Sequence, residues 1–120
     1  MRRHNHYEAA FEEYLRERRA PYVAVDETRR ALFEAGSLKS FDFLIAGPDR
    51  LHRLIDVKGR LFPAGGRRYW TNWLTDEDLT AATAWEGVFG STFRAAWLFA
   101  YDVLGVRSPT PDVDLFPFRD

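Results

Sequence analysis

The stretch from residue 40 to residue 60, SFDFLIAGPDRLHRLIDVKGR, constrains the fold of this chain more than any other. It contains two strand-like apolar runs, residues 41–46 and residues 54–58, with the turn signal Gly-Pro-Asp between them. This arrangement predicts a hairpin of adjacent antiparallel strands. Each run carries an aspartate, Asp42 in the first and Asp56 in the second, so we expect two carboxylates to be neighbours at one end of a sheet.

Lys58 follows Asp56 by two residues, and side chains two apart on a strand point to the same face. Two carboxylates and an ammonium at the rim of an apolar sheet require compensation, because unpaired charges near a core are costly. A magnesium ion supplies this charge compensation, since it binds hard oxygen ligands and retains waters for chemistry on phosphates. The lysine could then orient or deprotonate the attacking water, or stabilise developing charge. The structural alternative pairs the aspartates with arginines.

Lysine is rare in this chain. Of 17 basic residues, 15 are arginines and only Lys39 and Lys58 are lysines. Arginine is in effect always protonated and lysine is not, so a lysine at position 58 suits a proton-transfer or point-charge role. Codon bias in the genome is an alternative explanation of the arginine excess.

The motif Asp42, thirteen intervening residues, then Asp56-Val57-Lys58, behind an acidic N-terminal helix, resembles the PD-(D/E)xK nuclease superfamily. The opening run HYEAAFE, residues 6–12, also resembles the signature of the uncharacterised bacterial HYExAFE family. The resemblance covers roughly residues 6–101. Phe41 stands where the superfamily name has proline, a position that varies.

The resemblance implies a restriction-endonuclease-like or Holliday-junction-resolvase-like fold and cleavage of DNA with magnesium or manganese. It implies that Asp42 and Asp56 bind the metal and that Lys58 assists the water. We expect the main-chain carbonyl of Val57 to be a further ligand, and Glu8 or Glu12 to complete the site.

Residues 6–19 predict an amphipathic helix that ends before Pro21, because apolar side chains recur at helical spacing. Glu8 lies at the edge of the apolar arc, and Glu12 follows one turn later on the same side. Either carboxylate could reach the metal. The alternative for Glu12 is a solvent-exposed pair with Arg16.

The remaining elements complete an α/β order of helix, strand, strand, strand, helix, strand. Residues 22–26 predict a short strand and Thr75 caps a second helix to about residue 89. Residues 93–101 predict a central strand buried on both faces, whereas residues 27–34 are ambiguous between helix and loop. The expected fold is a mixed central sheet flanked by helices, with a nuclease-like domain over residues 1–105 and a proline-rich irregular tail over residues 106–120.

Basic and aromatic side chains near the aspartates indicate a nucleic-acid surface. Trp70 and Trp73 lie beside basic residues, which suits stacking on bases, although core packing is the better interpretation for at least one of them. Trp85 or Glu86 on the second helix could face the site. The residues expected to contact DNA are Arg29, Arg30, Lys39, Arg60, Arg67 and Arg68, with ordinary surface charge as the alternative for the first three.

Composition sets the wider class. With 120 residues, 46% of them hydrophobic, the chain can build one globular domain with its own core. The absence of cysteine excludes disulfides and thiolate metal sites. No apolar signal region or membrane-length run occurs, so we expect a cytoplasmic protein with no membrane contact. The net charge of −1 gives no general attraction to DNA and requires local basic patches.

These features favour a metal-dependent DNA endonuclease, with a homodimer as one form it could take. The first alternative is a catalytically silent nuclease-fold domain that binds nucleic acid or a protein partner. The second is a purely structural module.

Overall fold

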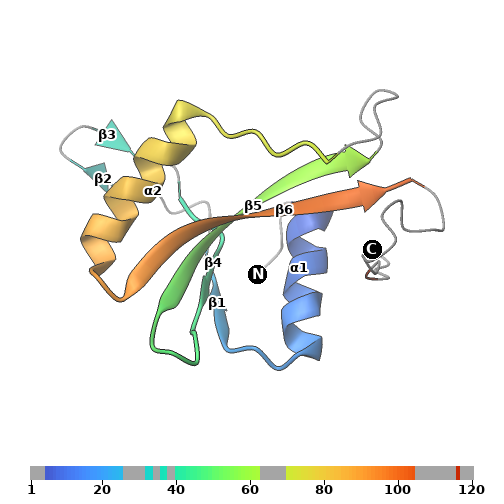
Figure 1. The fold of residues 1–120 in the computed structure, drawn as a ribbon, viewed down its shortest axis with the longest axis horizontal. Coiled ribbons are helices and arrows are strands. Elements are labelled where there is room, and N and C mark those ends of the chain that lie inside the picture. Colours follow the sequence, from blue (N-terminus) through green and yellow to red (C-terminus); the bar gives the residue numbers. More distant parts are fainter. Residues whose placement is uncertain are drawn as a thin grey trace.

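A mixed sheet of four strands, with one helix against each face, forms the centre of the protein (Figure 1). The computed structural model describes residues 5–25, 32–33, 36–37, 40–62, 70–104 and 116. The strand order in the main sheet is β1-β4-β5-β6. These strands are β1 (Tyr22–Ala24), β4 (Phe43–Ile45), β5 (His52–Phe62) and β6 (Phe93–Val103).

The type of pairing changes once across the sheet, from antiparallel to parallel. β1 and β4 are antiparallel, as are β4 and β5, whereas β5 and β6 run parallel over 11 residues each. The two long strands extend as a twisted ribbon beyond the short ones (Figure 1). A separate pair of short strands, β2 (Leu32–Phe33) and β3 (Gly36–Ser37), lies between β1 and β4 in the sequence and was not predicted.

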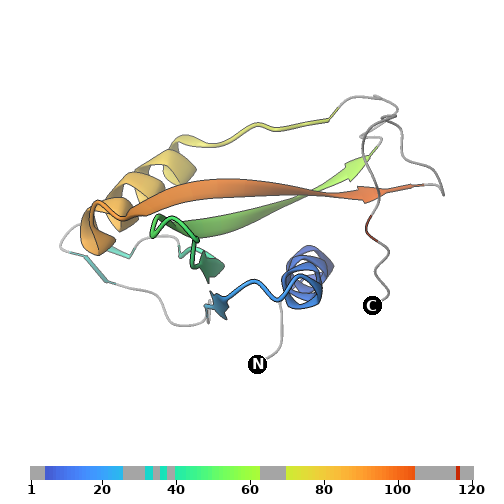
Figure 2. The ribbon, with the colours of Figure 1, turned by 60° about the horizontal axis from the view of Figure 1, so that its bottom comes forward.

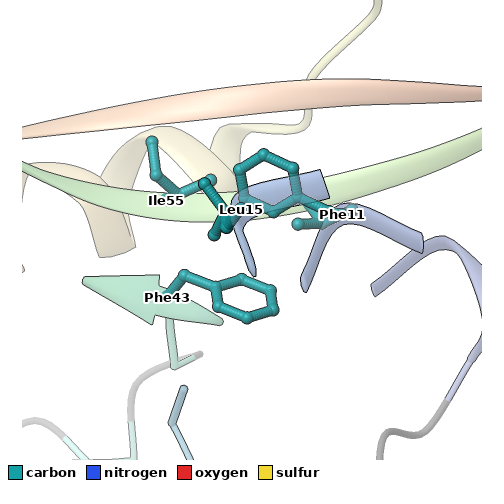
Figure 3. Close-up of a cluster of buried hydrophobic side chains, with 5 residues drawn as sticks. Phe11, Leu15, Phe43 and Ile55 are labelled. Atoms are coloured by element: carbon teal, nitrogen blue, oxygen red, sulfur yellow. The ribbon is translucent and has the colours of Figure 1, made fainter. Parts of the chain in front are cut away.

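Helix α1 (His6–Glu17) begins at Asn5, whose side chain accepts the N–H of Glu8. Its buried positions are Glu8, Phe11 and Leu15, a spacing that places them on one side of a helix. Phe11 and Leu15 pack on the sheet together with Phe43 and Ile55 (Figure 3). This cluster fixes α1 against one face of β4 and β5.

The approach of α1 to β5 depends on Gly59. A Cβ atom there would lie 2.1 Å from the ring of Tyr7, well inside contact distance. Burial raises the pKa of the Tyr7 phenol, and the negative charge of Asp102 adds to the effect. A residue without a side chain at position 59 therefore lets the first turn of α1 lie close to the strand that carries the predicted site.

Helix α2 (Asp76–Phe89) covers the opposite face and connects β5 to the parallel β6 (Figure 2). Thr75 caps it, as the sequence predicts, and the structure shows that the cap is a reciprocal capping box with Asp78. Phe41 meets the rings of Trp85 and Phe89 edge-on, with centroids 5.4 and 5.7 Å away. Aromatic packing thus ties α2 to the segment that leads into β4.

The structure confirms the α/β class and the mixed sheet and corrects two expectations. Residues 93–101 were expected to form a central strand buried on both faces, but β6 is an outer strand of the main sheet among the strands described. None of its residues belongs to the buried class. The apolar sequence of β6 reflects two half-covered faces and not a central position. The predicted strand at residues 54–58 is also longer than expected, because β5 begins at His52 and ends at Phe62.

The expected tail, residues 106–120, lies outside the described residues apart from Phe116, whose ring meets Tyr14 edge-on. Most of the ambiguous stretch at residues 27–34 also lies outside them. No helix in the described part of the chain is both long and apolar enough to cross a membrane.

Candidate metal and phosphate site

Asp42 precedes β4 and reaches sideways to the neighbouring strand. Its Oδ2 atom accepts the main-chain N–H of Val57 at 2.7 Å, and the residue is only 4% exposed. The pairing of β4 with β5 ends at Phe43 and Ile55. The carboxylate therefore takes the place that a main-chain acceptor would fill if β4 continued.

This contact brings Asp42 next to Val57, the residue that follows Asp56, on the neighbouring antiparallel strand of the predicted hairpin. In an extended strand the N–H and C=O groups of one residue point to the same edge. Since the Val57 N–H points to Asp42, the Val57 carbonyl also points to the edge where β4 has stopped. Asp42 and the Val57 carbonyl thus share this edge, whereas the carboxylate of Asp56 contacts Lys58 on the face that α2 covers.

Lys58 lies between two carboxylates. Its Nζ atom is 2.9 Å from Asp56 Oδ2 and 2.7 Å from Asp78 Oδ1. The ion pair with Asp56 confirms that residues 56 and 58 share a face, and this face is the one that α2 covers. The side chains of Lys58 and Asp78 are 11% and 3% exposed, so the second ion pair is largely removed from water.

Asp78 is the residue of this site that the sequence analysis missed. From the sequence it was only one of the residues that follow the cap Thr75 in the predicted second helix. In the structure it has two roles, because Oδ2 accepts the Thr75 N–H at 2.9 Å while Oδ1 binds Lys58. The separation of 20 residues between lysine and aspartate left no local signal of their contact.

The two helical glutamates have different surroundings. Glu8 is 3% exposed, lies on the sheet-facing side of α1, and accepts the side-chain amide of Asn5 at 2.8 Å. Glu12 instead accepts the Tyr22 hydroxyl at 2.9 Å and an N–H of Arg16 at 3.4 Å. The contact with Arg16 in the alternative interpretation of Glu12 is present, but the Glu12 side chain is only 16% exposed and its shorter bond is to Tyr22. Glu8 belongs to α1, which covers the face of the sheet opposite to that of Asp56 and Lys58.

Among the described residues, no group of three or more histidine, cysteine, aspartate or glutamate side chains is arranged to hold a metal ion. The donors expected from the sequence are two side chains, Asp42 and Asp56, and the main-chain carbonyl of Val57. This donor set is hard and made of oxygen, which suits magnesium with several retained waters. A metal there would compete with Lys58 for Asp56.

A small hollow opens beside Asp56 and Asp78 under α2. Its walls are mainly apolar and aromatic, with Phe41, Trp85 and Trp97 among them. Trp85 therefore lines the neighbourhood of the site. Glu86 does not reach it with its carboxylate, which accepts the N–H of Ala95 at the start of β6.

Of the predicted DNA contacts, Arg60 lies within the described residues, and it follows Asp56 and Lys58 on the same face of β5. The others, Arg29, Arg30, Lys39, Arg67 and Arg68, lie outside them. The two tryptophans before α2 differ. Trp70 packs on Phe62 and Tyr101, with ring centroids 4.3 and 4.7 Å away, whereas Trp73 is 61% exposed.

No known family, curated protein or solved structure matches this chain. The functional argument therefore depends on the residues of the site.

Proposed function

We propose that this protein is a magnesium- or manganese-dependent DNA endonuclease of the PD-(D/E)xK kind, with a restriction-endonuclease-like core. The observation that carries the proposal is the contact between the Asp42 carboxylate and the Val57 N–H. This contact supports the proposal because it joins the first acidic residue of the motif to the residue that directly follows the second one, Asp56.

In the proposed site the metal is held by Asp42, Asp56 and the carbonyl of Val57, with Glu8 as the glutamate that completes the shell. A bound magnesium ion would polarise the scissile phosphate and lower the pKa of a water ligand. The carboxylate oxygens of Asp42 and Asp56 are held in position because Asp56 belongs to β5 and Asp42 directly precedes β4. α2 and its aromatic packing cover one side of the proposed site.

Lys58 acts in this proposal as a fixed positive charge. Two carboxylates beside an amine favour its ammonium form, so proton abstraction from water is the less suitable of the roles expected for it. When Asp56 turns an oxygen to the metal, Asp78 keeps Lys58 charged and in position. The ammonium can then stabilise the negative charge that develops on the phosphate.

The test is cleavage of supercoiled, branched and single-stranded DNA in magnesium or manganese. We expect the wild-type protein to cut at least one of these, and the Asp56→Asn protein to cut none because a metal ligand is lost. A wild-type protein that leaves all three intact overturns the proposal. In that case DNA binding without cleavage supports the catalytically silent domain.

The silent domain is favoured by one observation, the double ion pair of Lys58. Because Lys58 is paired with Asp56 and Asp78, the lysine needs no phosphate and the carboxylates need no metal to compensate their charges. The two proposals differ in metal binding, since only the nuclease requires magnesium to displace Lys58 from one Asp56 oxygen.

The homodimer remains a proposal, and β6 is the edge that suits it. Its only charged residues, Arg94 and Asp102, lie equally far from Leu98 at the middle of the strand. Antiparallel pairing of two copies about Leu98 would place each Arg94 opposite Asp102 of the second copy. Long apolar edges are templates for such pairing. The cytoplasmic location also remains a prediction.

A further inference from the structure

Trp73 is an exposed aromatic side chain beside the candidate site. Its exposed fraction is 61%, although a buried tryptophan would contribute much more to stability. The neighbouring Trp70 shows the contrast, because its ring is packed between Phe62 and Tyr101. The exposure of Trp73 is therefore not a general property of this segment.

One face of the Trp73 ring is backed by a cation. The guanidinium carbon of Arg60 lies 4.4 Å from the ring centroid, within the range of a cation–π interaction. Arg60 Nη2 also donates to the carbonyl of Trp73 at 3.1 Å. The same arginine thus holds both the ring and the backbone of this residue.

A second contact holds the segment. The Tyr101 hydroxyl donates to the carbonyl of Thr71 at 2.7 Å, and burial raises the pKa of this phenol, which keeps its proton in place. Residues 70–75 run along the β5–β6 ribbon on the same side as α2 (Figure 2). Trp73 is therefore presented from a backbone that is fixed at two points.

The position of Trp73 relative to Lys58 is set by β5. Arg60 follows Lys58 by two residues on one face, a rise of roughly 6 to 7 Å along the strand. Two residues beyond Trp73, Thr75 caps α2, whose Asp78 binds Lys58. The Trp73 ring and the proposed phosphate site at Lys58 thus lie on the same side of the sheet.

We propose that Trp73, backed by Arg60, is a stacking site for an unpaired nucleobase next to the phosphate at Lys58. A flat exposed ring accepts any base, and phosphates are bound by the neighbouring positive charge. Bases in an intact duplex are already stacked on each other and cannot reach such a ring. The inference deepens the proposed nuclease function, because it names strands with unpaired bases as the preferred substrate class.

The test measures binding in the absence of metal, by fluorescence anisotropy of a labelled oligonucleotide. Three probes are compared: a single strand, the blunt duplex of the same sequence, and the same strand with abasic sites, which retain the phosphates. We expect the wild-type protein to prefer the normal single strand over both others. Trp73→Ala should weaken binding of that strand by about 5-fold or more, the lower limit for one stacked base, and leave the other two affinities unchanged.

Trp73→Phe keeps an aromatic ring and should retain most of the affinity. Val88→Ala removes another exposed apolar side chain, 56% exposed on α2, and should change nothing. Equal affinity of wild type for the normal and abasic strands overturns the inference, as does an equal loss on all probes in Trp73→Ala. If the protein cleaves DNA and Trp73→Ala changes neither binding nor cleavage, this inference is overturned and the nuclease proposal is not. Binding that depends on Trp73 but is never followed by cleavage overturns the nuclease proposal alone.

Discussion

The Asp42 carboxylate accepts the main-chain N–H of Val57 at 2.7 Å, across the point where β4 no longer pairs with β5. This hydrogen bond gives the aspartate a structural role in addition to the proposed metal-binding role. The two roles differ chemically, because the hydrogen bond needs only an oxygen that accepts, whereas metal binding needs the negative charge of a carboxylate. They can therefore be separated by mutation.

Asp42→Asn should keep the fold and lose magnesium. The amide oxygen can still accept the Val57 N–H, and replacing one of two neighbouring carboxylates relieves repulsion between like charges. Asp42→Ala should instead cost about 1 to 3 kcal/mol of unfolding free energy, because a buried N–H loses its acceptor. Urea unfolding and magnesium titration of both variants check this. If Asp42→Asn unfolds the domain, the residue is a structural ion-pair partner.

Lys58→Ala should lower cleavage by about 100-fold or more, the scale expected when a charge that stabilises the transition state is lost. It should also cost about 3 kcal/mol of unfolding free energy, because Asp56 and Asp78 are left without their cation. Lys58→Arg should rescue activity only in part, since the guanidinium fork is larger than an ammonium. Single-turnover cleavage rates provide the measurement.

Stability and activity at Lys58 can be separated through Asp78. Adding Asp78→Asn to Lys58→Ala should restore part of the unfolding free energy, because a buried charge that has lost Lys58 is removed while the amide can still cap α2. Cleavage should not recover. Full activity of Lys58→Ala, alone or in the double variant, would remove the lysine from the mechanism.

Gly59→Ala should destabilise the protein by about 1 to 3 kcal/mol, the usual cost of inserting a methyl group into a packed contact. The added Cβ would overlap the Tyr7 ring, so α1 must shift away from β5. Combining it with Tyr7→Ala should make the two costs less than additive. Thermal unfolding of the two single variants and the double variant tests this, and strictly additive effects would show that residues 7 and 59 are not in contact.

Local patterns in the sequence were enough to predict much of this fold. The alternation of side chains on a strand placed Asp56 and Lys58 on one face, and the Thr75 cap marked the start of α2. Both depend on residues within a few positions of each other. The α/β class follows from the same local periodicities.

The errors concern relationships between distant residues. The apolar run of β6 indicates that both faces of the strand are covered, but it does not indicate which strands pair with it. The outer position of β6 in the sheet was therefore not predicted. Asp78 was only one of the residues that follow the cap Thr75, and no nearby residue indicated its ion pair with Lys58. The bond of Glu12 to Tyr22 likewise joins residues of two different elements.

Charge exchange on β6 tests the proposed dimer. In the Arg94→Asp variant, aspartates would face one another across the interface. In the Asp102→Arg variant, arginines would face one another. Each variant should therefore dimerise less than the wild-type protein, because like charges repel. An equimolar mixture should form heterodimers, because both cross-strand pairs are then opposite in charge. Sedimentation velocity measures this. A wild-type monomer, or a mixture that associates no better than its components, contradicts the interface.

The most direct test of the metal site is a crystal of the protein soaked in manganese, read by anomalous diffraction. The account predicts a peak at the corner where β4 stops, about 2 to 2.6 Å from oxygens of Asp42 and Asp56 and from the carbonyl of Val57. Lys58 should then remain bound to Asp78. A soaked crystal with no peak there, and with Lys58 still bridging Asp56 and Asp78, would contradict the account.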